Sequence, residues 1–209
     1  MMKMMTGEAE STKRGYDLRK RLENMDQTRQ AVLQAARGQL EAQGYRQMTM
    51  ASLAAESGVT RQTIHNLFGS KRAVLETLFD AIALESGMER MREVMTHRDP
   101  EAMLQAFVGV FCNFWEKNRV LFRRIHGIGA IDPDFGELID ARNERRHGAA
   151  IRIVKRLKDD RDTDESAATL TALTSFEFYD ALARFGKTGA EAETAICKLA
   201  SAALGIRLD

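Results

Sequence analysis

The sequence has little proline and cysteine and no long apolar run, and each shortage excludes a class of protein. Two prolines in 209 residues and the lack of alternating β-branched runs argue against a β fold. Cys112 and Cys197 are far apart and have no CxxC neighbour, which is typical of small buried residues in a reducing compartment. No apolar run approaches the roughly 20 residues of a membrane span, and residues 1–27 lack the apolar core of a signal peptide. We therefore expect a cytoplasmic protein with no membrane partner.

Alanine- and leucine-rich segments with helical periodicity predict an all-α fold. The chain is long enough for one large domain or two small ones. Counting charges separates two regions: residues 1–79 hold 12 Lys/Arg against 8 Asp/Glu, and the remainder holds 19 against 22. The basic excess of about +4 in the first region favours a polyanionic partner there.

Residues 1–27 mix charged and small polar residues without a hydrophobic face, so we expect a flexible basic arm. Its positive charges include Lys13, Arg14, Arg19, Lys20 and Arg21. Two interpretations stay open: a tail that touches DNA, as some arms enter the minor groove, or a solvated leader.

The first domain, residues 28–79, should hold three helices and the beginning of a fourth, longer one. A helical period begins at Thr28, and Thr49 caps a short helix that Gly58 ends. Thr60 caps the next helix, and Ser70 caps a longer one.

The second domain, residues 80–209, should also be helical. We expect helices over residues 101–117, about 119–126 and about 134–158, with a glycine-containing loop before the third. A further helix should run from Thr163 to about Phe185, and a last one should end near Leu204.

The segment from Met50 meets the steric requirements of a helix-turn-helix. Ala54 provides the small residue where two helices cross closely, and Gly58 provides the turn four residues later. Apolar residues that can pin the second helix against the first are Leu53, Val59, Ile64 and Leu67. The unit can therefore present a short second helix at a fixed angle on the surface.

The outer face of that second helix carries base-reading chemistry. With Ile64, Leu67 and Phe68 turned inward, the outward residues are Arg61, Gln62, His65 and Asn66. Residues 59–70 contain no acid that would repel phosphate. Arginine can bind guanine, and Gln or Asn can bind adenine, in the major groove of double-stranded DNA.

Residues around this helix suit the phosphate backbone. They are Thr49, Thr60, Thr63 and Lys71. Each has a plainer alternative, because the threonines can act only as helix caps, Lys71 can be solvated, and His65 can be a surface histidine.

The stretch from Thr28 to Phe79 resembles the DNA-binding domain of tetracycline-repressor-like (TetR/AcrR) regulators. Its pattern is TRQAVLQAARGQLEAQGYRQMTMASLAAESGVTRQTIHNLFGSKRAVLETLF. The AAESGVT turn and the TIHNLFGSK exit into a long helix are the most specific parts. Family members usually have glycine, tyrosine, proline and an acid where this chain has Gln62, His65, Gly69 and Arg72. Because His65 replaces the tyrosine, the family's tyrosine–phosphate contact is not expected to carry over unchanged. Gly69 should loosen the turn before the following helix.

The resemblance implies a homodimer joined by its last two helices, which binds a palindromic operator and represses transcription. A small effector would enter the carboxy-terminal domain, move residues 70–95, and release the DNA.

Met and aromatic residues in the middle of the chain could line a pliable effector pocket. The candidate residues are Phe107, Phe111, Trp115, Phe122, His126, Phe176 and Tyr179, although the ordinary interpretation of each single residue is a place in the core. Few acids accompany them, which favours an apolar or aromatic effector over a cation. The arginines between positions 142 and 156 have acidic neighbours at helical spacing, so we expect a solvated ion-pair face there.

Two alternatives stay open: a small-molecule binding protein with a vestigial helix-turn-helix, and a TetR-like activator. We expect neither an enzyme nor a cofactor, since the sequence shows no nucleophile–base pair and no phosphate-binding loop. The four histidines lack metal-binding spacing.

Overall fold

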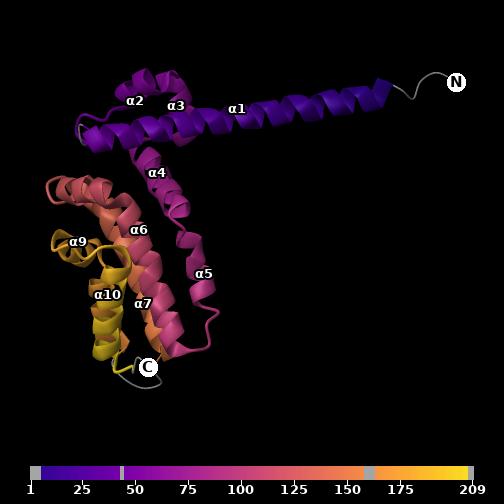
Figure 1. Ribbon diagram of the computed structural model, residues 1–209. Coiled ribbons are helices and arrows are strands. Elements are labelled where there is room, and N and C mark those ends of the chain that lie inside the picture. The colour runs from indigo at the N-terminus through magenta and orange to yellow at the C-terminus, as the bar shows by residue number, and fades with distance from the viewer. Residues whose placement is uncertain (1–5, 43–44, 158–162, 207–209) are drawn as a thin grey trace. The chain divides into compact units, whose positions relative to one another are not determined.

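The computed structural model describes residues 6–42, 45–157 and 163–206, and every regular element within them is a helix (Figure 1). The all-α prediction is confirmed. The chain divides into two compact units, residues 1–78 and residues 79–209. None of the described helices is long and apolar enough to cross a membrane.

The first unit is built from α1 (Thr6–Ala42), α2 (Met50–Ser57), α3 (Arg61–Phe68) and the first part of α4 (Lys71–Glu85). Helix α1 packs on α2, and α2 packs on α3. Apolar residues at helical spacing on each element meet in one small core, because burying these faces is the main stabilising contribution. The core includes Val32, Leu33, Ala36, Leu40, Met48, Leu53, Ile64, Val74 and Leu75.

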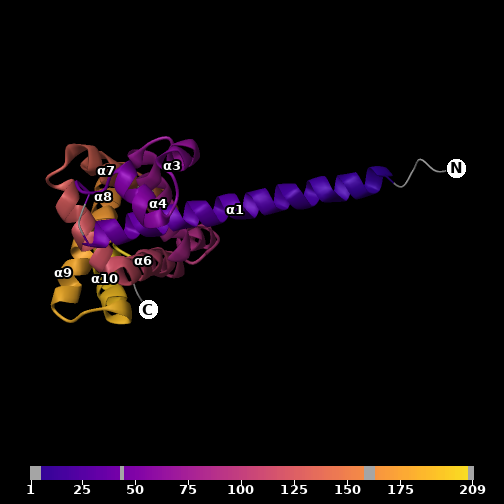
Figure 2. The ribbon, with the colours of Figure 1, turned by 90° about the horizontal axis from the view of Figure 1, so that it is seen from above.

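The first helix begins earlier than the sequence predicts. Its backbone is helical from Thr6, not from Thr28, and its amino-terminal part continues straight beyond α3 (Figures 1 and 2). Residues 1–5 of the predicted arm lie outside the described part of the chain. Residues 19–27 are exposed, so this part of α1 has no buried face, which is why hydrophobic periodicity did not reveal it.

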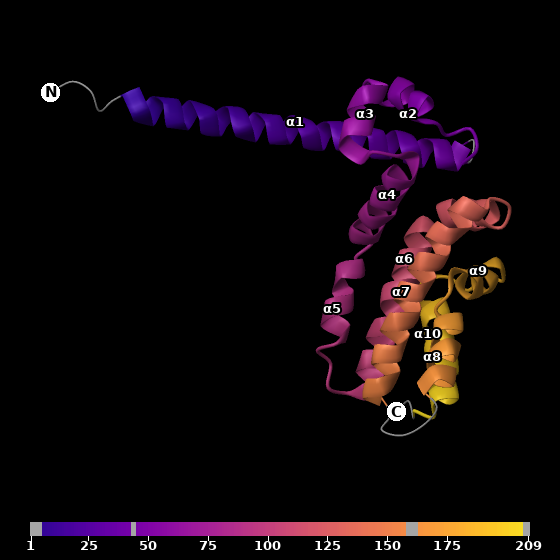
Figure 3. The ribbon, with the colours of Figure 1, turned by 180° about the vertical axis from the view of Figure 1, so that it is seen from behind.

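The second unit contains the rest of α4, the 3₁₀ turn η1 (Met88–Arg90), α5 (Met91–Val94), α6 (Pro100–Gly129), α7 (Pro133–Leu157), α8 (Thr163–Leu173), α9 (Phe176–Arg184) and α10 (Gly189–Leu204). Helix α6 lies beside both α7 and α10, and α8 completes the group by packing on α7 and α10 (Figure 3). Asp99 begins α6 by accepting a hydrogen bond from the Ala102 amide at 2.7 Å, with proline at the first helical position.

A kink in α6 replaces the predicted break between two helices. Asn118 has φ −119° and ψ 15°, yet helix continues on both sides of it to Gly129. Its side-chain amide donates to Ser86 Oγ at 2.7 Å and to the Phe114 carbonyl at 2.9 Å. The buried side chain thus supplies hydrogen bonds at the bend, and the predicted glycine loop shrinks to Ala130–Asp132.

The predicted helix from Thr163 to Phe185 is two helices. Helix α8 ends at Leu173, where the Thr174 hydroxyl donates to the Leu170 carbonyl at 2.8 Å. Ser175 then caps α9 by accepting from the Phe178 amide at 3.1 Å. Hydroxyl side chains offer the backbone an alternative to the helical hydrogen bond, which accounts for the break.

Candidate nucleic-acid interface and ligand cavity

The turn between α2 and α3 has the geometry that the sequence predicts. Gly58 ends α2 in the left-handed conformation with φ 70°, which costs glycine little. Thr49 caps α2 in a reciprocal capping box with Ser52, and Thr60 caps α3 by accepting from the Thr63 amide at 3.0 Å. The start of each of the two helices is therefore fixed by local hydrogen bonds.

A polar bridge that the sequence analysis missed holds α2 on α1. Gln39 is buried, and its amide donates to Glu56 Oε2 at 2.7 Å. Ser52 Oγ donates back to Gln39 Oε1 at 2.8 Å. The only sequence signal was a glutamine on the apolar face of α1, beside Ala36 and Leu40, where a partner has to be supplied.

Helix α3 buries Ile64 and Phe68 and exposes the opposite face. The exposed side chains are Arg61, Gln62, His65 and Asn66, as predicted from helical spacing. Gln62 Nε2 donates to Asn66 Oδ1 at 2.9 Å, so these two side chains form one amide pair one turn apart. The pair leaves amide donors and acceptors on the surface for a base edge.

The four residues expected to bind phosphate lie at helix starts. Thr60 and Thr63 join their hydroxyls at 2.8 Å, and Thr49 is exposed at its cap. Lys71 Nζ lies 3.4 Å from the centroid of the Tyr45 ring and donates to the Tyr45 carbonyl at 3.3 Å. Thr60 and Thr63 therefore present a pair of hydrogen-bonded hydroxyl groups, and the Tyr45 ring positions the Lys71 ammonium.

Gly69 occupies a backbone conformation that proline cannot adopt. It ends α3 with φ 79°, whereas the proline ring fixes φ near −65°. Its amide donates to the His65 carbonyl at 2.8 Å, a bond that proline would lack. The turn that follows α3 therefore differs locally from the proline-containing turn expected from the family that the sequence resembles.

The second unit contains a cavity of about 290 Å³ next to α6 and α7. Four of the predicted pocket residues line it, namely Phe111, Trp115, Phe122 and His126. The other three lie elsewhere. Phe107 is fully buried in the core, Phe176 faces a separate open depression, and Tyr179 is fully buried.

Trp115 is the centre of the ring cluster beside the cavity. Its centroid lies 4.7 Å from Phe114, 5.0 Å from Phe122 and 5.6 Å from Phe176 in edge-to-face arrangements. The indole nitrogen donates to the Thr174 carbonyl at 3.0 Å, at the break between α8 and α9. The indole orientation is therefore fixed by its polar atom as well as by packing.

Four arginines of α7 line the cavity, and the burial of one of them, Arg146, corrects the expected solvated ion-pair face at that position. They are Arg142, Arg145, Arg146 and Arg152. Arg146 is only 8% exposed, and burial lowers its pKa to about 10, so it stays cationic near neutral pH. A signal was available: Leu138, Arg146 and Ile153 share the inward face of α7 by spacing, and both apolar neighbours are buried.

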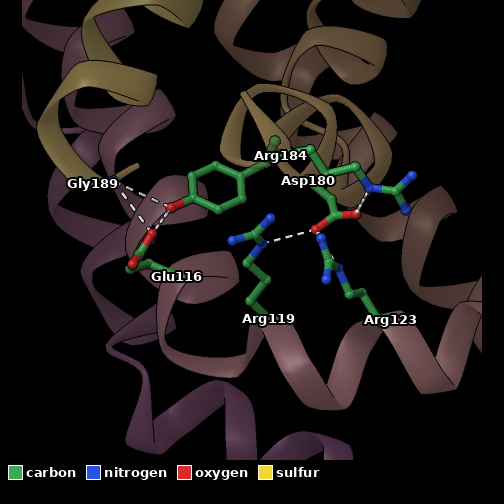
Figure 4. Close-up of polar contacts among 7 residues, drawn as sticks. Glu116, Arg119, Arg123, Asp180, Arg184 and Gly189 are labelled. Carbon is green, nitrogen blue, oxygen red and sulfur yellow. Dashed lines mark hydrogen bonds and ion pairs between the residues drawn. The ribbon is translucent and has the colours of Figure 1, made fainter. Parts of the chain in front are cut away.

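Asp180 in α9 holds three arginines, an arrangement that sequence analysis did not find (Figure 4). Its carboxylate accepts from the Nε atoms of Arg119 at 2.8 Å, Arg123 at 2.7 Å and Arg184 at 3.0 Å. Burial favours the neutral acid, but the hydrogen bonds from the arginines outweigh it and lower the pKa of Asp180. The cluster ties α9 to the second half of α6.

Tyr179, which directly precedes Asp180 in α9, has a structural role. Its hydroxyl donates to the Glu116 carboxylate, and the Gly189 amide lies 3.3 Å from both the Tyr179 hydroxyl and Glu116 Oε2. These contacts join α6, α9 and the start of α10. Tyr179 is therefore occupied with holding three helices together.

Cys112 and Cys197 are both buried and free, in agreement with the expectation of small core residues. Burial raises the pKa of Cys112 to about 12 and that of Cys197 to about 11. Both thiols are thus protonated near neutral pH and poor nucleophiles.

The caps, the glycine turn and the exposed polar face of α3 define a helix-turn-helix DNA-binding domain followed by an all-helical second unit. Residues 32–78 match the sequence profile of bacterial regulatory proteins of the tetR family. The first unit is therefore a tetR-family DNA-binding domain, and the chain has the fold of TetR-type transcription regulators. No curated protein matches the sequence.

Solved structures with this fold come from several organisms. A TetR-family regulator from Syntrophomonas wolfei superposes with a TM-score of 0.69 at 16% identity, over 88% of this chain and 98% of that chain. A protein from Clostridium perfringens that is provisionally described as a fatty acid metabolism regulator superposes with a TM-score of 0.61 at 19% identity, over 86% of this chain and 100% of that chain. A regulator from Saccharomonospora viridis in complex with choline superposes with a TM-score of 0.56 at 19% identity, over 83% of this chain and 93% of that chain.

Proposed function

We propose that this protein is a ligand-responsive transcriptional repressor that binds a palindromic DNA operator as a homodimer. A small apolar or aromatic effector in the second unit releases it from DNA. Arg61, Gln62, His65 and Asn66 contact bases, and Thr49, Thr60, Thr63 and Lys71 contact the phosphate backbone.

The observation that carries this proposal is the exposed face of α3. Its four outward side chains are all major-groove donors or acceptors, and no acid occurs in residues 59–70. A solvated helix face has no need of this composition, because glutamate and lysine serve solubility equally well. The buried Ile64 and Phe68 hold the face in a fixed orientation, as base reading demands.

Selection of binding sites from random duplexes tests the proposal directly. An enriched palindrome is expected, and Arg61→Ala should weaken binding to it by about 1–3 kcal/mol in a gel-shift titration while relaxing the preference at one base pair. Arg46→Ala is the matched control, because Arg46 is exposed in the same unit but lies outside α2 and α3. Failure to enrich any palindrome would favour a binding protein with a vestigial helix-turn-helix.

Exposed small side chains on two adjacent helices support the homodimer. Ala168 and Ala172 are exposed on α8, and Ala202 and Ala203 are exposed on α10, which packs on α8. Such faces allow helices of a second copy to approach closely. Sedimentation equilibrium should give a dimer, and a monomer at micromolar concentration would contradict this part of the proposal.

The cavity supports the effector. Its lining includes aromatic rings and two thioethers, which suit an apolar body. An effector is expected to reduce the affinity of the protein for its selected operator. A reporter placed downstream of that operator would distinguish repression from activation, because a repressor lowers the signal until the effector is added.

A further inference from the structure

The charges around the cavity do not balance. Its lining includes four arginines, and among the described lining residues Asp80 provides the single carboxylate. Asp80 Oδ1 accepts from Arg142 at 2.8 Å and lies 4.0 Å from Arg145. The carboxylate is therefore shared between two arginines, and the cavity keeps an excess of positive charge from Arg146 and Arg152.

Arg146 is the buried member of this excess. Its terminal nitrogens donate to the Thr171 carbonyl and, at 3.1 Å, to Asn143 Oδ1, which are both neutral acceptors. Its Nε is buried and has no hydrogen-bond partner among the described residues. Glu177 pairs directly with His126 Nδ1 at 2.6 Å and acts on Arg146 only by charge attraction without a hydrogen bond, which raises the pKa of Arg146 and only partly offsets the effect of its burial. A buried guanidinium in such surroundings calls for an anion.

The remaining walls are apolar. Phe111, Phe114, Trp115 and Phe122 contribute rings, and Met88 and Met91 contribute flexible thioethers. The volume of about 290 Å³ suits a compact body, such as two fused rings or a short alkyl chain.

We propose that the cavity binds an organic anion, in which a compact apolar or aromatic body carries one carboxylate that Arg146 holds. The rings beside Trp115 enclose the body, and Arg152 adds attraction for the anion. The inference rests on the proposed function in one respect, since it names the chemical class of the effector, but binding itself requires no DNA. A cationic ligand is disfavoured by the same four arginines.

Calorimetric titration of the full chain with matched probes tests this assignment. Naphthoate and octanoate supply the carboxylate on a ring and on a chain, and naphthalenemethanol and octanol are their neutral counterparts. At least one carboxylate should bind about 10- to 100-fold more tightly than its alcohol, the range of a charge-assisted hydrogen bond to a buried partner. Arg146→Met should remove that preference and leave binding of the alcohol unchanged.

Lys155→Met is the control, because Lys155 is exposed on the same helix and does not line the cavity. It should keep the preference for the carboxylate. Equal affinity for acid and alcohol in the unaltered protein, no binding of any probe, or a preference that survives Arg146→Met would each overturn the proposal. The first two results need no variant, so they hold even if Arg146→Met fails to fold. A carboxylate that binds in this way but does not release operator DNA would support the cavity assignment and contradict the proposed function.

Discussion

Asp180 should contribute more to the stability of the second unit than any exposed carboxylate, although it belongs to neither proposed site. Asp180 is 4% exposed, and its replacement by Asn removes the negative charge that three guanidinium groups share. The Arg119 side chain is 24% exposed, so its bond should account for about 1.5 kcal/mol, as for hydrogen bonds to charged groups. The more exposed Arg123 and Arg184 should add roughly 0.5 kcal/mol each after solvent screening. Asp180→Asn should therefore lower the free energy of unfolding by about 2–3 kcal/mol at pH 7.

Urea titration followed by Trp115 fluorescence measures this loss, because the single tryptophan lies in the second unit. Asp140→Asn is the control, an exposed carboxylate on α7 that should change stability by less than about 0.5 kcal/mol. The pKa of Asp180 is lowered on folding, so its contribution is present above the unfolded pKa of about 3.9 and is lost as the pH falls below it. Equal stability of Asp180→Asn and the unaltered protein at pH 7, or a difference that persists undiminished in acid, would refute this reasoning.

Three further predictions concern single side chains. Lys71→Ala should weaken binding to all DNA sequences alike and lower the slope of log affinity against log salt by about 1; an unchanged slope in a salt series of gel shifts would remove Lys71 from the phosphate contacts. The hydrogen bond from His126 lowers the pKa of Glu177 to about 2, so Glu177→Gln should cost up to about 1 kcal/mol at pH 7 and much less at pH 2, because the contribution is lost as the pH falls from the unfolded pKa through the folded one; urea titration at both pH values measures this, and the carboxylate is 64% exposed and therefore screened. Phe107→Ala should reduce the free energy of unfolding by about 3–5 kcal/mol without changing the preference for a carboxylate probe, because Phe107 is fully buried and does not line the cavity; a selective loss of probe binding would contradict that placement.

The helix-turn-helix was predictable because its determinants are local. Thr49 and Thr60 cap the helices that follow them, Gly58 permits the turn, and helical spacing alone separates buried Ile64 from exposed His65. No distant contact is needed to place these residues. The base and phosphate contacts assigned to the exposed side chains stay predictions.

The features that sequence analysis missed depend on contacts between distant segments. Asp180 meets Arg119 and Arg123 across about sixty residues, and periodicity carries no information about such pairs. The break at Thr174 depends on hydroxyl groups that fit a helix interior almost as well as a cap. Arg146 was detectable by its inward spacing, but the abundance of charge on α7 favoured an exposed face.

The bend of α6 has a mechanical consequence. Both amide hydrogens of Asn118 are engaged, one with the Phe114 carbonyl at the bend and one with Ser86 Oγ, and Ser86 directly follows the last residue of α4. Asn113 adds a hydrogen bond to the Ser86 carbonyl at 2.6 Å. A molecule that separated the rings on either side of the bend would therefore have to displace the end of α4 or break a buried hydrogen bond, so these hydrogen bonds couple the bend to that helix end.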